Sequence, residues 1–104
     1  MMEEIIKVLW SASDSRKECR VNLQGEPFPR IIHPYGVCQT SNGKIVVVCK
    51  QVGGYTKGGG FEGYRNLILE KVKEVELLEK SFTIALDFDP KNSLYGEWVY
   101  FITN

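Results

Sequence analysis

The chain has 104 residues, which is the length of one domain, and its 13 basic side chains balance its 13 acidic ones. A net charge of zero argues against a protein that coats nucleic acid regardless of sequence, because such a protein needs a large cationic excess to displace counterions. No apolar run approaches the roughly 20 residues of a membrane span, and the opening Met-Met-Glu-Glu lacks the basic flank of a signal peptide. We therefore expect one cytoplasmic domain over residues 1–104, with no membrane partner.

The cysteine pattern bears on both redox state and chemistry. Cys19, Cys38 and Cys49 are odd in number and lack close spacing, which favours free thiols in a reducing compartment over a disulfide. A zinc site with His33 would need spacings that match none of the usual Cys-x₂₋₄-Cys patterns. A Cys–His nucleophile pair would need a lowered thiol pKa, and the neighbouring sequence offers no cause for one. We expect buried free cysteines, no metal, no cofactor and no enzymatic activity.

The first elements in chain order are a helix and a strand. Apolar side chains at Met2, Ile5, Ile6 and Leu9 follow one helical stripe and predict a helix over residues 2–12. Trp10 is interpreted as a lid over the core, with a ligand contact as the alternative. Residues 19–23 alternate between apolar and polar side chains, as a half-buried strand does.

Residues 30–50 are the segment around which the rest of the chain is organised. Asn42-Gly43 predicts a hairpin with a two-residue type I′ turn, since both residues tolerate positive φ. Residues 45–49 are all apolar, which fits a strand buried on both faces. Pro34 interrupts the first strand and predicts that this strand either lies at an edge or bends there.

Six glycines within residues 51–63 predict a segment that forms neither helix nor regular strand. The segment is either a loose connection or a mobile loop that closes over a ligand through Tyr55, Lys57 and Phe61. In both cases we expect residues 53–60 to be mobile.

The last part of the chain is read as strands with one ambiguous stretch. Residues 64–69 predict a strand, whereas residues 70–80 have helix-favouring residue types and apolar positions that fit neither period. Residues 82–88 alternate as a strand would, and residues 89–92 supply a turn. Residues 97–103 are rich in β-formers and predict a further strand, whose apolar side chains need cover from the domain itself or from a second copy.

Several matches in a fixed order carry a family resemblance. They are Arg30-Ile-Ile-His-Pro34, the Asn42-Gly43 turn, Ile45-Val-Val47, Arg65-Asn-Leu-Ile-Leu-Glu-Lys71-Val72 and Phe82. In this order the chain resembles the WYL domain, although aliphatic residues replace the Trp-Tyr-Leu triplet. The late strand of that family also carries a Phe and a second Arg, where this chain has Leu67 and Lys71.

The resemblance implies a mainly β fold: a small SH3-like or Sm-like β-barrel with one N-terminal helix. The strand predicted over residues 97–103 would be an extra C-terminal strand outside this barrel. The resemblance also implies a turn and a short strand over residues 70–80. WYL domains usually follow a winged helix-turn-helix in bacterial transcription regulators, where they are thought to sense a ligand, often nucleic acid or a nucleotide. No helix-turn-helix is visible here, so the chain would be a free-standing sensing half or a divergent relative.

Two functions from different classes follow. In the first, cations from separate strands converge on phosphate and tyrosines stack on bases. The ligand-binding residues are then Arg30, Arg65, Lys71, Tyr35, Tyr55 and Tyr64. In the second, the domain binds a protein or forms a homodimer through a sheet edge or the Trp98–Tyr100 segment, without a small ligand. The arginines would then pair with Glu26, Glu62 or Glu70 or lie on a solvated face. The positions of Arg30, Arg65 and Lys71 distinguish the two functions: a cluster favours ligand binding, and a scattered arrangement favours protein interaction.

Overall fold

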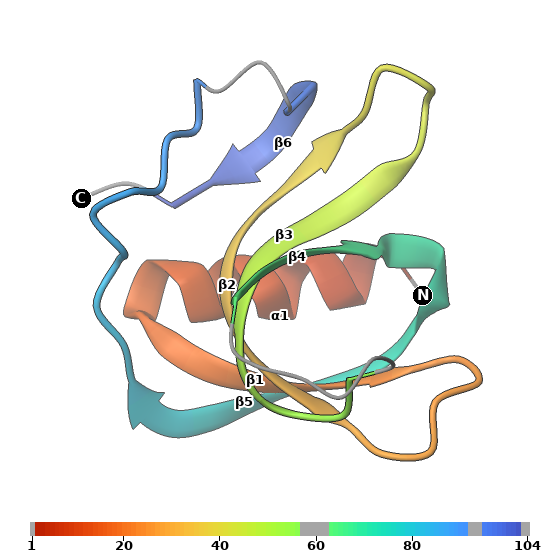
Figure 1. Cartoon of the computed structure of the whole chain (residues 1–104), viewed down its shortest axis with the longest axis vertical. Helices are drawn as coiled ribbons and strands as arrows, with labels where there is room; N and C mark the ends of the chain where they lie inside the picture. The colour runs from red at the N-terminus through yellow and green to blue at the C-terminus, as the bar shows by residue number, and fades with distance from the viewer. Residues whose placement is uncertain (1, 57–62, 92–94, 103–104) are drawn as a thin grey trace.

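A computed structural model describes residues 2–56, 63–91 and 95–102. Its elements are α1 (Met2–Ser15), β1 (Lys17–Leu23), β2 (Arg30–Gln39), β3 (Ile45–Gly54), β4 (Gly63–Ile68), the 3₁₀ turn η1 (Leu69–Lys71), β5 (Val72–Ser81) and β6 (Glu97–Phe101). In this part of the chain the six strands form one antiparallel sheet in the order β4-β3-β2-β1-β5, with β6 added to β2 (Figure 1). The predicted mainly β fold with one N-terminal helix and an extra C-terminal strand is confirmed. The sheet is bent but not closed, so the SH3-like or Sm-like barrel implied by the resemblance is not confirmed.

The helix begins and ends where its side chains dictate. Glu3 and Glu4 lie in the first turn, where the helix dipole favours negative charge. The helix runs three residues past the predicted end, because Ser13 is buried and its hydroxyl donates to the Pro34 carbonyl at 2.9 Å. It stops at Arg16, whose φ of 58° places it in the left-handed region.

Strand β2 lies at the centre of the sheet and changes its partner halfway. One edge pairs with β3 along its length, while the other pairs with β1 over residues 30–32 and with β6 over residues 36–39. The change occurs at Pro34, which has no N–H to offer a neighbour, and the register shifts between Pro34 and Gly36. Of the two alternatives for this proline, the bend is confirmed and the edge strand is wrong.

The β2–β3 hairpin is confirmed, but the predicted type I′ turn is wrong. Gly43 has a φ of 85°, whereas Asn42 does not have positive φ. The Gly43 N–H donates to the Thr40 carbonyl at 2.9 Å, and the Thr40 N–H donates to the Lys44 carbonyl at 2.7 Å. The Thr40 hydroxyl also donates to the Asn42 side chain. These bonds close a longer loop in which only the glycine takes the left-handed conformation.

Two further expectations are corrected, and the ambiguous stretch is resolved. Strand β3 extends through Gly53 and Gly54, which pair with β2, so the glycine-rich segment begins as regular strand. Residues 70 and 71 belong to the 3₁₀ turn η1, and residues 72–80 lie in β5, whose pairing with β1 overrides helix propensity. This agrees with the turn and strand implied by the resemblance. Residues 82–88 are not a strand but an irregular segment with a turn at residues 86 and 87. Lys57 and Phe61 lie outside the described residues, as do residues 57–60 of the loop predicted to be mobile.

The sheet separates two cores. The inner core lies between the sheet and α1, and it is aliphatic except for Tyr100 and two cysteines; it contains Leu9, Ala12, Cys19, Val21, Leu23, Ile32, Val37, Val47, Cys49, Leu67, Leu69, Val72 and Tyr100. The outer core lies between the other face and the C-terminal segment; its buried members are Tyr35, Cys38, Val46, Val48, Phe82 and Ile102, with Ile84, Ala85, Phe88, Tyr95 and Trp98 packed against them. In Figure 1 this blue segment runs up the left side and returns to β6 at the top. Strand β3 faces both cores, as predicted.

Candidate functional site

The Arg30 side chain lies at the start of β2 and makes hydrogen bonds from all three of its nitrogen atoms. Its Nε and Nη2 atoms donate to the two Glu26 carboxylate oxygens at 2.8 and 2.6 Å, and its Nη1 donates to Gln51 Oε1 at 3.1 Å. The guanidinium carbon lies 5.9 Å from the centre of the Tyr55 ring. The hydrogen bonds with Glu26 raise the pKa of Arg30. Both side chains of this ion pair are less than 10% exposed. The Glu26 carboxylate therefore occupies the guanidinium face that would have bound a phosphate.

The Gln51 side chain connects this ion pair to the glycine-rich segment. Gln51 is buried, and its amide nitrogen donates to the Gly53 carbonyl at 3.1 Å and to the Tyr55 carbonyl at 2.8 Å. Gly54 has a φ of 86°, and a Cβ there would lie 2.4 Å from the Pro29 carbonyl oxygen. The chain can therefore turn out of β3 only with glycine at this position.

Arg65 lies opposite the middle of β3, whereas Arg30 pairs with Gly54 at the end of that strand. Arg65 is half-buried on β4 opposite Cys49, and its Nη1 donates to the Tyr64 carbonyl at 2.9 Å. Burial raises the pKa of the Cys49 thiol to about 12, and the positive charges of Arg30 and Arg65 oppose that shift. The two arginines therefore act on one buried thiol, which is protonated at neutral pH and is not a nucleophile.

Lys71 lies away from both arginines. It ends η1, beside the start of β3, where it borders a hollow of about 330 Å³ together with Gly43, Lys44, Ile45, Ile68 and Glu70. Arg30 pairs with Gly54 at the other end of β3. The structure thus brings Arg30 and Arg65 toward Cys49, and it places Lys71 with Lys44.

The three predicted tyrosines have structural contacts. The Tyr35 hydroxyl is buried and accepts the Ala85 N–H at 2.9 Å, and the Tyr64 hydroxyl donates to Asp87 Oδ1 at 2.6 Å. Burial is the main cause that raises the pKa of both phenols. The two rings meet edge to face at 6.0 Å, and together they hold the C-terminal segment on the sheet. Tyr55 packs beside Arg30.

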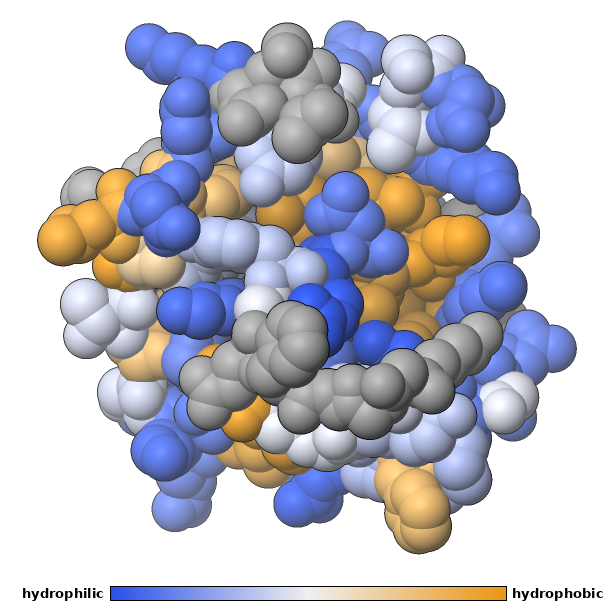
Figure 2. Space-filling model, in the orientation of Figure 1, coloured by the Kyte–Doolittle hydropathy of each residue, from blue (hydrophilic) through white to orange (hydrophobic). Residues whose placement is uncertain are grey.

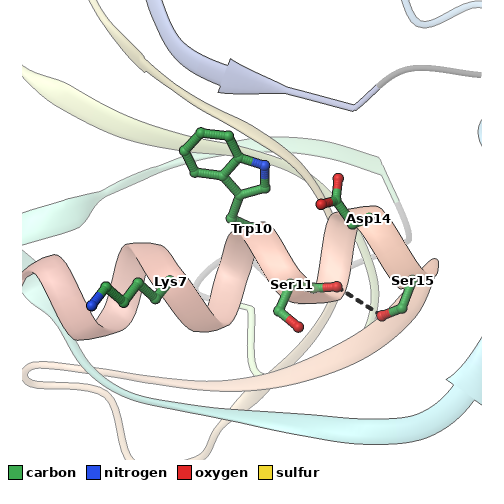
Figure 3. A pocket seen from close by; sticks show the side chains of 5 residues that line it. All are labelled: Lys7, Trp10, Ser11, Asp14 and Ser15. Atoms are coloured by element: carbon green, nitrogen blue, oxygen red, sulfur yellow. Dashed lines mark hydrogen bonds between the residues drawn. The ribbon is translucent and has the colours of Figure 1, made fainter.

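Trp10 borders a shallow hollow on the solvent side of α1, with a volume of about 530 Å³ (Figure 3). The indole ring stacks on the Tyr100 ring at 4.8 Å and is 44% exposed. Figure 3 shows Lys7, Ser11, Asp14 and Ser15 along the same helix, with the Ser15 hydroxyl donating to the Ser11 carbonyl. The indole covers Tyr100 of the inner core, which agrees with the lid interpretation.

The candidate metal and nucleophile residues are dispersed: Cys19 and Cys49 lie in the inner core, Cys38 lies in the outer core, and His33 is half-buried outside both. The three thiols are free and buried, as predicted. His33 lies 2.9 Å from the Glu18 carboxylate and stacks on Phe82 at 4.4 Å. Across the described residues no group of three or more His, Cys, Asp or Glu side chains lies close enough to hold a metal ion.

Comparisons with protein-family models, with curated proteins and with solved structures found no match to this chain. The resemblance to the WYL domain therefore stays a prediction. No helix in the described part of the chain is long and apolar enough to cross a membrane.

Sequence reasoning missed two features of these regions. It named Glu26 among three acidic partners for Arg30 but gave no means to choose it, and it did not consider Gln51. It also passed over Lys44, because a lysine beside a hairpin turn carries no signal of its own. A carboxylate four residues before Arg30, across a Gly-Glu-Pro connector, is the one local sign that could have indicated the ion pair.

Proposed function

We propose that this chain is a homotypic protein-interaction domain, in which an open edge of one sheet pairs with an open edge of a second copy. The observation that carries the proposal is the order of the sheet. It ends at β4 on one side and at β5 on the other, and neither strand has a second strand partner among the described residues. Unpaired backbone donors and acceptors at a sheet edge are a template for strand addition.

Strand β5 is the longer of the two edges. It spans ten residues, and most of its side chains after Val72 are exposed, including Leu77 at 46%. Its charged residues are three glutamates and two lysines, whereas Arg65 is the one charged residue of β4. The two edges therefore carry opposite net charge, which favours contact of β4 with β5 over contact between like edges. Such a head-to-tail contact builds rings or filaments.

The distribution of the predicted cations also supports this function over the sensing function. Arg30 is held in an ion pair with Glu26, and Lys71 lies at the far end of β3. The Trp98–Tyr100 segment is a less suitable interface, because Tyr100 is buried in its own domain and the Trp98 Nε1–H donates to the Pro90 carbonyl at 2.8 Å. The domain itself buries Tyr100 and Ile102, whereas Val99 and Phe101 remain exposed.

Two adjacent proline variants test the proposal. Neighbouring residues of an antiparallel strand direct their N–H groups to opposite edges, so one of Glu76→Pro and Leu77→Pro removes an outward donor and the other removes a bond to β1. We expect the wild-type mass in sedimentation equilibrium to rise with concentration. The proline variant that keeps the higher melting temperature should remain monomeric. A wild-type chain that is monomeric at every concentration would contradict the proposal.

Ligand sensing, as implied by the WYL resemblance, is the second candidate. It is favoured by the exposed Lys71, which shares a hollow with a second lysine. Titration of the chain with AMP and a short thymidine strand at low salt is the test. Absence of binding to any phosphate-bearing ligand would contradict it.

A further inference from the structure

The hollow between the β2–β3 turn and η1 combines two kinds of surface. Its polar side contains Lys44, Lys71 and Glu70, and its apolar side contains Ile45 and Ile68. Figure 2 shows hydrophobic surface between the start of β3 and the end of β4, with hydrophilic residues around it. Its volume of about 330 Å³ lies at the small end of the range of ligand sites.

The backbone on both sides of the hollow is fixed. The Thr40 N–H donates to the Lys44 carbonyl on the hairpin side, and the Gln24 N–H donates to the Lys71 carbonyl at 2.8 Å on the other side. Val46 pairs with Ile68 in the β3–β4 ladder and so joins the two sides. A ligand would therefore order only the two exposed lysine side chains, which keeps the entropic cost of binding low.

The charged side chains that line the hollow do not form ion pairs with one another. Within the described part of the chain, neither the Lys44 nor the Lys71 ammonium group has an ion pair or a hydrogen bond to its nitrogen. Glu70 likewise has no ion pair there. Two ammonium groups and one carboxylate leave one net positive charge beside an apolar wall, which is the combination that recognises an amphipathic anion.

We propose that this hollow binds a small organic phosphate, with the phosphate between Lys44 and Lys71 and the apolar body on Ile45 and Ile68. The inference gives the ligand-sensing candidate a place and a ligand class, and it does not depend on the sheet-edge contact. None of the predicted tyrosines lines the hollow, so an apolar body packs here on aliphatic side chains and not on an aromatic face.

The test compares three probes by amide chemical shifts and calorimetry. Phenyl phosphate carries both features, inorganic phosphate lacks the apolar body and benzyl alcohol lacks the charge. We expect phenyl phosphate to bind several-fold more tightly than either of the others and more weakly as salt rises. The shifted amides should belong to residues 43–45 and 68–71. Equal binding of phenyl phosphate and inorganic phosphate would show an adventitious anion contact only and would overturn the proposal.

Four variants refine the test. Lys44→Gln and Lys71→Gln should each weaken phenyl phosphate by about tenfold, the effect of one lost charge-assisted contact. Lys73→Gln, which removes a nearby exposed lysine that does not line the hollow, should change affinity less than twofold. Glu70→Gln should strengthen binding, because it removes the repelling carboxylate. All four positions are exposed, so melting temperatures should stay close to wild type. Tight binding that is indifferent to Lys44 and Lys71 would overturn this site while leaving ligand sensing intact elsewhere.

Discussion

The two faces of the sheet are covered by different means. The inner core is closed by α1, a regular element whose Leu9 and Ala12 are fully buried. The outer core is closed by an irregular segment that depends on aromatic rings and hydroxyl groups: Tyr35 and Tyr64 bond to it, and Phe88 meets Tyr35 edge to face at 4.7 Å. A helix satisfies its own backbone, whereas an irregular cover must obtain its hydrogen bonds from the sheet. The comparison explains why polar aromatic residues gather on the outer face.

The largest expected effect comes from removing the outer cover. A chain cut after Phe82 loses the rest of the C-terminal segment and β6, and it exposes Tyr35, Cys38, Val46 and Val48 to water. We expect it to aggregate or to melt at a much lower temperature, because a large apolar face and a freed edge of β2 become accessible. Light scattering and thermal unfolding measure this. A shortened chain with unchanged mass and melting point would mean that the outer core contributes little.

A smaller effect is expected at the buried ion pair. Glu26→Gln leaves the Arg30 charge with little access to water, and breaking such a pair costs about 3 kcal/mol of unfolding free energy. Replacing both residues, as Glu26→Gln with Arg30→Met, should recover much of that loss. Urea unfolding of the single and double variants is the measurement. A single variant as stable as wild type would show that the pair is solvated in solution.

Val47 and Val48 provide a matched comparison of the two cores. They are adjacent in β3, both are almost fully buried, and Val47 faces the inner core while Val48 faces the outer core. We expect Val47→Ala and Val48→Ala each to cost about 1–3 kcal/mol, scaled from larger core truncations. The exposed Val99→Ala serves as the control and should cost far less. A cost near zero for Val48→Ala alone would indicate that the outer core is loosely packed.

A separate effect concerns alkaline pH. Burial raises the pKa of Cys19 and of Cys49 from 9.0 to about 12, so the folded state retains protons that the unfolded state releases. This stabilisation is fully present below pH 9 and is lost as pH rises toward 12. Unfolding free energies should therefore fall from pH 8.5 to pH 10.5. The Cys19→Ala/Cys49→Ala variant should show a shallower fall, and an identical slope would remove the thiols as the cause.

The sequence predicts the parts of this fold that depend on local signals. The unbroken apolar run in β3 indicates burial on both faces, and Asn42-Gly43 indicates the hairpin, although the Thr40 side chain then selects a different turn. The pairing of β6 with β2 has no local signal, since it joins Cys38 to Trp98 across most of the chain. The candidate site was predicted less well. Arg30 belongs to an ion pair, and the neighbour of Lys71 is Lys44. Neither contact could be predicted, because the convergence of side chains depends on tertiary contacts that sequence periodicity does not encode.

The change of partner at Pro34 has a consequence for how the chain reaches this fold. The β2–β3 hairpin needs only local contacts, and its β2 strand then offers one half of its free edge to the N-terminal β1 and the other half to the C-terminal β6. The two ends of the chain therefore dock on separate parts of one template and do not compete. Such a hairpin would serve as the folding nucleus, with native contacts in the transition state concentrated at residues 36–48 and later docking of β6. The docking of β6 requires glycine at position 36, because a Cβ there would lie 2.6 Å from both the Trp98 ring and the Tyr100 carbonyl oxygen.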